Sequence, residues 1–377
     1  MKKKTLIKIL FLAIILFPFS EPLFSFNFIF GYVIKIFTIS VLLISSLYFM
    51  FKIAILKDVK VLKTSLLLCV YVLYICFRDF DNFPIFGVTI LINFGASFFV
   101  YYIARHDLLN SSDLKYFYSK YVYISLIIFF SSYYFISDKV VGPSFLIMPI
   151  FMYLIYFYWN HPQKMLWYYL IILAITAFSG KRTVFLSGLL GLLIYFYNYR
   201  ESYSKMVLKK ITSAFLISSI IILGSIYLYN TNPLFKYRVE QSLSPTEDSR
   251  SLLYGYIISE YLSFDSNQRI YGIGFNGVKS LTFGKIENIH AHNDFLELLV
   301  DTGVIGVSLY ILFLLFFLKF ILLKKHNRIH KSMVVFVFMS WLILSFTQSN
   351  IYAPTSIMYF VLLGFILGTD RHKLQVN

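Results

Sequence analysis

The sequence predicts an all-α fold: a polytopic transmembrane bundle of about twelve spans with one large extracytoplasmic loop that contains short helices. Hydrophobic residues make up 59% of the 377 residues and charged residues only 14%, and the mean hydropathy is +0.73. A soluble domain needs roughly a quarter charged residues to cover its surface. Apolar runs long enough to cross a bilayer recur along the chain. We therefore expect one integral membrane domain over residues 1–377.

The apolar runs mark the expected spans. A helix crosses a hydrocarbon core of about 30 Å with roughly twenty residues. Several runs are shorter or closely spaced, so the pattern allows about ten to fourteen spans. The expected spans are 5–20, 28–51, 61–78, 84–104, 116–136, 143–158, 165–178, 183–199, 211–229, 303–323, 332–348 and 354–369.

The distribution of lysine and arginine predicts the orientation of the chain. Cytoplasmic loops of membrane proteins are enriched in these residues. An inside N-terminus leaves only Lys139 and the pair Lys181–Arg182 in the short outer loops. Both termini are then cytoplasmic, and the polar segment 230–302 faces away from the cytoplasm. The cations expected inside are Lys2, Lys3, Lys4, Lys52, Lys57, Lys60, Arg105, Lys115, Lys164, Arg200, Lys205, Lys209, Lys210, Lys324, Lys325, Arg328, Lys331, Arg371 and Lys373.

The net charge of +16 also reflects the basic residues of the loops between the expected spans. The basic residues form short clusters between apolar runs, which is typical of membrane topology and of contact with anionic lipids. We expect no nucleic-acid partner. Cys69 and Cys76 lie in one apolar run, on the same side of one helix. They suit packing, and they provide neither a disulfide framework nor a metal site.

A histidine-rich turn stands near the end of the outer segment. His290-Ala291-His292-Asn293 precedes an apolar run in which Leu296, Leu299, Val300 and Gly303 recur at helical spacing. Asn293 is a suitable N-cap, so the histidines would lie where a helix begins. Imidazole titrates near neutral pH and can accept a proton from a hydroxyl group. The alternative is a capped helix with two solvated histidines.

Two arginines of the outer side occupy positions that suit an anion. Arg250 falls in the first turn of an expected amphipathic helix, with an apolar stripe made by Leu252, Leu253, Tyr256 and Ile257. Such a helix would lie along the membrane surface. Lys181 and Arg182 begin a span from the outer side, against both the positive-inside bias and the helix dipole. These cations predict an anion-binding corner. Contact with lipid headgroups is the alternative.

Other patterns in the sequence give weaker evidence for a functional site. The run Tyr271-Gly272-Ile273-Gly274-Phe275-Asn276-Gly277 permits a tight turn, and no Lys-Ser/Thr follows it, so we interpret it as a structural turn. Asp79-Phe80-Asp81 resembles an acidic metal–nucleotide pair but falls on the outer side. His326 and His330 have no further ligands nearby. No metal site or cofactor is expected.

Together these residues resemble the O-antigen ligase/polymerase family of bacterial polysaccharide assembly. The resemblance covers roughly residues 175–310. It rests on Arg182 in Ser179-Gly180-Lys181-Arg182-Thr183, on Arg250, on the Tyr271–Phe275 run, and on His290-Ala291-His292-Asn293 followed by Gly303-Val304-Ile305-Gly306. The outer loop is short for a ligase, which leaves the acceptor open.

The resemblance implies a function and assigns roles. Arg182 and Arg250 would bind the diphosphate of an undecaprenyl-diphosphate-linked glycan, and His292 would be the catalytic base. Lys181, His290, Asn293 and Glu297 would support them. The expected activity is metal-independent, inverting glycosyl transfer to a lipid-linked repeat unit, as in a polymerase of O-antigen or capsule.

The resemblance also implies a location and partners. The enzyme would lie in the bacterial inner membrane with its active site on the extracytoplasmic side. A chain-length regulator and a flippase are expected partners, beside the lipid-linked substrates and membrane lipids. An O-antigen ligase that transfers finished glycan to lipid A-core is the nearest alternative. A lipid-linked oligosaccharide transporter is the alternative from another class, although no similarity between two halves supports it.

Overall fold

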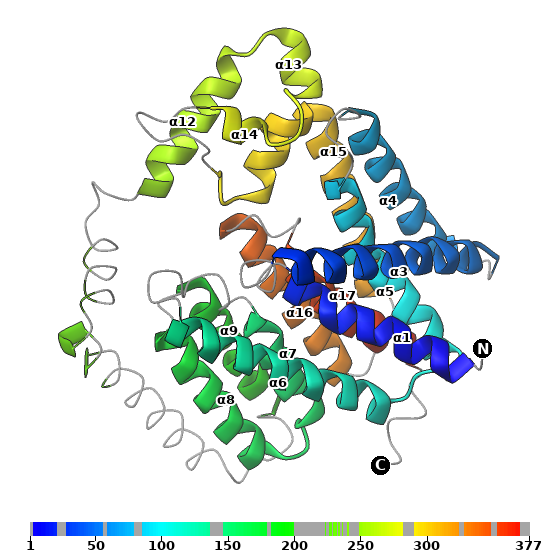
Figure 1. The fold of residues 1–377 in the computed structure, drawn as a ribbon, viewed down its shortest axis with the longest axis vertical. Helices are drawn as coiled ribbons and strands as arrows, with labels where there is room; N and C mark the ends of the chain where they lie inside the picture. Colours follow the sequence, from blue (N-terminus) through cyan, green and yellow to red (C-terminus); the bar gives the residue numbers. More distant parts are fainter. Residues whose placement is uncertain are drawn as a thin grey trace. The chain divides into compact units, whose positions relative to one another are not determined.

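The structure is a computed structural model in which every regular element of the described residues is a helix (Figure 1). The described residues group into two compact units, 1–121 with 253–377, and 122–252. The single membrane domain predicted over 1–377 stays a prediction. The model describes residues 3–20, 28–55, 59–78, 85–135, 146–178, 182–199, 249–281, 290–323, 328–347 and 353–369, with isolated positions between 223 and 240.

The expected spans coincide with helices wherever the structure describes them. Only the span predicted at 211–229 lies largely outside the described residues. The helices before the outer segment are α1 (Lys3–Leu16), η1 (Phe17–Phe19), α3 (Phe28–Ile55), α4 (Val59–Arg78), α5 (Ile85–Arg105), α6 (Ser111–Phe135), α7 (Met148–Phe157), α8 (Pro162–Phe178) and α9 (Arg182–Tyr199). The later ones are α12 (Ser249–Ser263), α13 (Ser266–Tyr271), α14 (Gly277–Ser280), α15 (Asp294–Leu323), α16 (Arg328–Thr347), η6 (Pro354–Ser356) and α17 (Ile357–Gly368).

Aromatic side chains join the helices of the first unit into one core. The ring of Phe94 on α5 lies 4.7 Å from Phe313 on α15, 5.5 Å from Trp341 on α16 and 4.2 Å from Phe360 on α17. All residues of α17 are buried. Such edge-on and tilted ring pairs add to the packing between helices. The core therefore fixes the position of α15, the helix that carries the histidine turn.

The second unit is built from α7, α8 and α9 with the end of α6. Phe151 on α7 lies 4.6 Å, centroid to centroid, from the ring of Tyr169 on α8. The Tyr169 hydroxyl donates a hydrogen bond of 2.7 Å to the carbonyl oxygen of Gly188 on α9. A buried hydroxyl needs such a partner. The contact ties α8 to α9, the helix that begins at Arg182.

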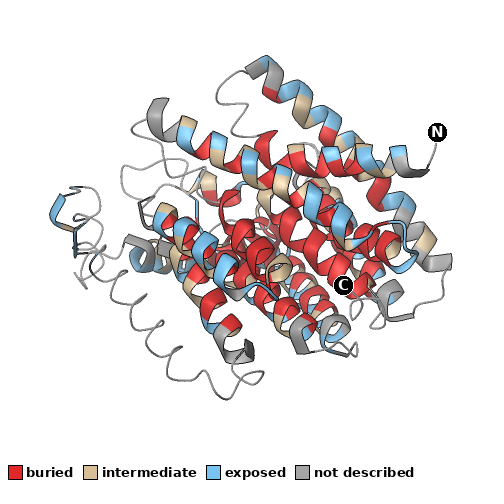
Figure 2. Ribbon diagram, turned by 90° about the horizontal axis from the view of Figure 1, so that it is seen from below, coloured by how far each residue is buried: buried red, intermediate tan, exposed pale blue. Residues whose placement is uncertain are grey.

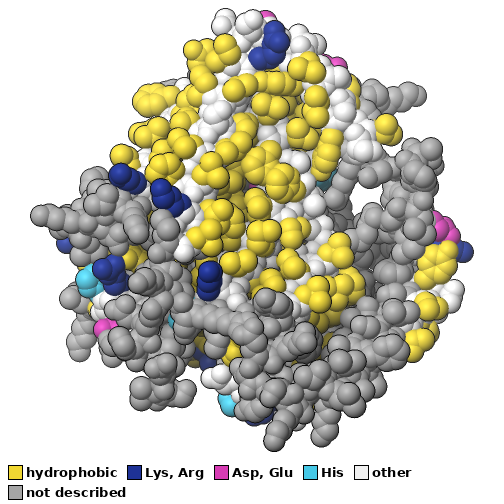
Figure 3. Space-filling model, turned by 180° about the vertical axis from the view of Figure 1, so that it is seen from behind, with side chains coloured by type: hydrophobic (Ala, Val, Ile, Leu, Met, Phe, Trp, Pro, Cys, Tyr) yellow, Lys and Arg dark blue, Asp and Glu magenta, His cyan; other side chains and the backbone are white. Residues whose placement is uncertain are grey.

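Four helices of the described residues are long and apolar enough to cross a membrane, in the windows Gly31–Tyr48, Gly87–Arg105, Asp294–Lys319 and His330–Thr347. Six further apolar helices are shorter. Figure 2 shows outer helices that are buried along one side and exposed along the other, and Figure 3 shows a broad surface of hydrophobic side chains with few charges. Helix α4, for example, exposes the apolar side chains of Leu66, Leu73 and Phe77. The chain is thus a helical membrane protein, while the count of twelve spans and the loop topology stay predictions.

Candidate active site

The histidine turn runs directly into a capped helix. The Asn293 side-chain oxygen accepts hydrogen bonds from the backbone N–H groups of Phe295, at 3.0 Å, and Leu296, at 3.2 Å. These N–H groups have no carbonyl partner at the start of a helix, so a side-chain cap stabilises α15. The predicted N-cap is confirmed. His290 and His292 therefore lie just before the first turn of α15.

The residue between the two histidines anchors the turn. Ala291 is fully buried in a small core with Ile257, Val278 and Val300. His290 and His292 on either side of it are exposed. His292 has a φ of 51°, in the left-handed region. Few residues other than glycine adopt this conformation, although histidine does so more often than most. The buried alanine and the left-handed residue after it together hold both imidazoles at the surface.

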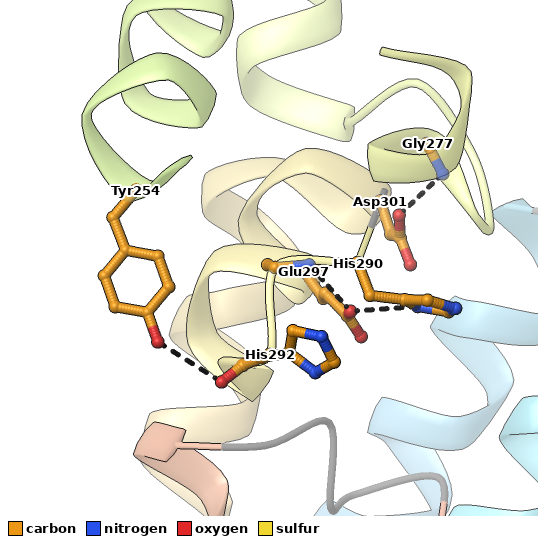
Figure 4. Close-up of polar contacts among 7 residues, drawn as sticks. Tyr254, Gly277, His290, His292, Glu297 and Asp301 are labelled. Carbon is orange, nitrogen blue, oxygen red and sulfur yellow. Dashed lines mark hydrogen bonds and ion pairs between the residues drawn. The ribbon is translucent and has the colours of Figure 1, made fainter. Parts of the chain in front are cut away.

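Glu297 links this turn to the helix. Its Oε1 accepts a hydrogen bond of 3.1 Å from the backbone N–H of Ala291 and lies 3.5 Å from Nδ1 of His290. The centroids of the His290 and His292 rings are 6.1 Å apart. Figure 4 shows both imidazoles beside the Glu297 carboxylate. Burying a carboxylate is costly unless donors face it, so these contacts constrain where Glu297 and the turn can lie.

The end of α16 closes the site from another side. The side-chain amide of Asn293 donates to the carbonyl oxygen of Phe346 at 3.3 Å. The Tyr254 hydroxyl on α12 lies 3.4 Å from the same oxygen. It also lies 3.3 Å from the carbonyl oxygen of His292 (Figure 4). The rings of Phe295 and Phe346 stack with centroids 4.7 Å apart. Helix-end carbonyls need partners, and here the site residues supply them.

A break in α15 lies six residues beyond Glu297. Gly303 has non-helical dihedral angles, φ 65° and ψ −169°, inside the helix. The break turns the carbonyl groups just before it out of the helical pattern, so they need new donors. The donors are the N–H of Ile273 for Val300 at 2.9 Å, the N–H of Gly274 for Asp301 at 3.1 Å, and the hydroxyl of Tyr74 for Thr302 at 2.9 Å.

The glycine-rich run packs its backbone against this break. A Cβ atom on Gly303 would lie 2.3 Å from the Ile270 carbonyl oxygen, and one on Gly272 would lie 2.3 Å from the Asp301 carbonyl oxygen. Both glycines have positive φ, which other residues rarely adopt. Asp301, itself buried, accepts a hydrogen bond of 2.8 Å from the N–H of Gly277. The run is therefore a structural turn, as predicted.

The amphipathic helix predicted after Asp248 is α12, and most of its apolar stripe faces the protein. Ile257 is buried, and Leu253 and Tyr256 pack against the same small core that holds Ala291. Leu252 is exposed. Burial raises the pKa of the Tyr261 hydroxyl, and this hydroxyl donates to the Arg269 carbonyl oxygen at 2.8 Å, which closes the corner between α12 and α13. Helix α12 thus supports the histidine turn.

The remaining candidate residues lie in the other unit or outside the described residues. Arg182 is the first residue of α9 and Arg250 the second of α12, as predicted for cations at helix starts. Both belong to the unit 122–252, whereas His292 belongs to the unit with 253–377. Their convergence on one substrate stays a prediction. Lys181 lies outside the described residues.

The structure adds three residues that the sequence interpretation missed: Tyr254, Asp301 and Phe346. The sequence did contain a signal for Asp301, because Asp294, Glu297 and Asp301 recur at helical spacing. All three are buried in the structure. Tyr254 and Phe346 had no such signal. The Tyr254 hydroxyl donates to the backbone carbonyl of His292, and Phe346 accepts from Asn293 through its own backbone carbonyl. Within the described ranges, no group of three His, Cys, Asp or Glu side chains could hold a metal ion.

The long apolar helices and the capped histidine turn at the end of one of them define a helical membrane protein with a polar site. Residues 167–311, less than half of the chain, match the model of a family described as O-antigen ligase. The match includes α8, α9, α12 and the site in α15, and it supports assignment of the chain to the O-antigen ligase/polymerase family. No curated protein matches the chain.

Proposed function

We propose that the chain polymerises a bacterial surface polysaccharide. It would move a growing glycan from undecaprenyl diphosphate onto a lipid-linked repeat unit of O-antigen or capsule. The observation that carries the proposal is the position of His292: exposed, in a turn anchored by Ala291 and Glu297, inside the segment that matches the family. A fixed imidazole at the surface is suited to act as a general base.

In the proposed reaction, His292 takes the proton of an acceptor sugar hydroxyl while that oxygen attacks the anomeric carbon of the donor. The bond from this carbon to the diphosphate breaks, and undecaprenyl diphosphate leaves with the electron pair. Direct displacement inverts the configuration at the anomeric carbon. A positioned base contributes about 10²–10⁴-fold in rate.

Arg182 and Arg250 would bind the diphosphate. Each is at the start of a helix, where free N–H groups also favour an anion. Guanidinium groups bind phosphate oxygens through paired, charge-assisted hydrogen bonds. They would offset the growing charge of the leaving group, so the proposed mechanism needs no metal ion. Lys181, next to Arg182 in the sequence, would add to the positive field.

The proposed reaction requires the site to face away from the cytoplasm, where lipid-linked glycans are polymerised in this scheme. The chain would then lie in the inner membrane with both termini in the cytoplasm. A flippase would deliver the repeat units, and a chain-length regulator would act on the product. The distribution of basic residues supports this orientation.

A deletion strain complemented with the wild-type chain, His292→Ala or His161→Ala tests the proposal. His161 is an exposed histidine at the start of α8 and serves as the matched control. We expect a gel of surface polysaccharide to show a ladder with wild type and His161→Ala, and none with His292→Ala. A full ladder with His292→Ala would refute the base, and unaltered polysaccharide in the deletion strain would refute the function.

The ligase is the second candidate, because the matching family is described as O-antigen ligase. The same deletion strain separates the two. Single repeat units on the final carrier indicate a lost polymerase. Long chains that remain on undecaprenyl diphosphate indicate a lost ligase, which would contradict the polymerase proposal.

A further inference from the structure

The two histidines of the turn differ in their surroundings. His290 Nδ1 lies 3.5 Å from the Glu297 carboxylate, and its side chain is 47% exposed. Glu297 itself is buried, with only 8% of its side chain exposed. One edge of the His290 ring therefore faces a fixed carboxylate, while half of the ring is open to solvent. A carboxylate in this position selects one tautomer of a neutral imidazole and orients the ring.

The position of Glu297 is constrained by more than the histidine. The same Oε1 atom accepts the Ala291 N–H at 3.1 Å, and Ala291 is fully buried. Glu297 also lies on the first turns of α15, which Asn293 caps. The carboxylate therefore has little freedom to move away from His290. Its geometry is a property of the helix start and is present before any substrate binds.

We propose that His290 is a second functional imidazole, which binds the hydroxyl groups of the acceptor saccharide through Nε2 while Glu297 holds Nδ1. With the proton on Nδ1 directed toward Glu297, Nε2 accepts a hydrogen bond from a sugar O–H. The inference rests on the proposed function and deepens it. His290 acts in binding of the acceptor, His292 acts in proton transfer, and Glu297 is the positioning residue of His290.

The distance between the imidazoles fits this division. Ring centroids 6.1 Å apart allow the two side chains to contact neighbouring hydroxyl groups of one sugar. Both rings lie on the exposed side of the turn, because the buried Ala291 holds the backbone between them.

The test is the initial rate of the purified full-length protein in detergent at varied concentrations of lipid-linked repeat units, extracted from the deletion strain. We expect His290→Ala to raise KM about tenfold, the effect of one lost hydrogen bond, with a smaller change in kcat. His292→Ala should instead lower kcat by about 10²-fold or more. An unchanged KM in His290→Ala would overturn the inference.

A double-mutant cycle tests the role of Glu297. In Glu297→Gln the side-chain oxygen can still accept the Ala291 N–H, so the turn should keep its fold. We expect this variant to raise KM less than His290→Ala does, because the amide oxygen can still accept from Nδ1 but carries no charge. The double variant should be no worse than His290→Ala alone, since Glu297 acts through His290. Additive effects would show that Glu297 has an independent role and would overturn the positioning assignment.

The control is Asp265→Asn, an exposed acid that caps α13, whose side-chain oxygen can still accept the Gln268 N–H. It should leave KM and kcat near the wild-type values. The kinetics of His290→Ala and His292→Ala also separate this inference from the proposed function. If His292→Ala keeps its kcat while His290→Ala raises KM, the proposed mechanism fails and the acceptor site stands.

Discussion

The carboxylate of Glu297 accepts the backbone N–H of Ala291 at 3.1 Å, so a side chain within α15 holds the turn that precedes the helix. Together with the burial of Ala291, this contact holds the turn that carries both histidines, because Ala291 stands between them. The turn is thus part of the helix start and not an independent loop.

The diphosphate assignment predicts the effect of arginine substitutions. We expect Arg182→Ala and Arg250→Ala each to lower kcat/KM about ten- to a hundredfold, because each loses charge-assisted hydrogen bonds. Arg182→Lys and Arg250→Lys should recover part of the loss, since lysine keeps the charge but not the paired geometry. Initial rates of the purified protein measure the effect. Arg269→Ala, an exposed arginine on α13, is the control, and an equal loss there would contradict the assignment.

The break in α15 predicts that Gly303 does not tolerate a side chain. A Cβ at this position would lie 2.3 Å from the Ile270 carbonyl oxygen, and the positive φ adds strain. We expect Gly303→Ala to cost more than about 3 kcal/mol and to lower the melting temperature in detergent sharply.

Gly255→Ala on α12 is the matched control for Gly303→Ala. A Cβ there meets nothing within 4 Å. Alanine should stabilise this helical position by up to about 1 kcal/mol. If both variants melted at the same temperature, the close packing around Gly303 would be wrong.

Two substitutions at Asn293 separate its two contacts. Asn293→Ala removes both the cap and the donor to Phe346, and we expect a loss of about 1–2 kcal/mol in stability. Asn293→Asp keeps the cap and places a negative charge at the helix start, where it is favourable. It should therefore unfold close to wild type in thermal scans. Equal destabilisation by both variants would show that the contact with Phe346, and not the cap, carries the stability.

The proposed orientation predicts opposite accessibility for two exposed residues. In a background without Cys69 and Cys76, Asn267→Cys on α13 should react with a membrane-impermeant maleimide in intact cells. Lys331→Cys on α16 should react only after the membrane is opened. Gel shifts of the labelled protein report both. Labelling of Lys331→Cys from outside would reverse the topology and remove the basis of the proposed function.

Much of the fold could be predicted from the sequence, because local patterns decide it. Apolar runs long enough for a bilayer produced helices at the predicted positions, and Asn293 before an apolar periodic run produced the predicted cap. The glycines of the Tyr271–Phe275 run indicated a turn, since only glycine adopts positive φ without cost. These signals lie within a few residues of the feature that they determine.

The tertiary structure alone decided how the histidine turn is held. Ala291 is buried because α12 and α14, distant in sequence, cover it, and Glu297 reaches back to Ala291 because the cap sets the direction of the first turn. The contacts of Tyr254 and Phe346 with the turn each involve a backbone carbonyl, of His292 and of Phe346, which leaves no pattern of residue types. Sequence periodicity encodes which face of a helix is apolar, whereas the partner of that face is set by packing between distant segments.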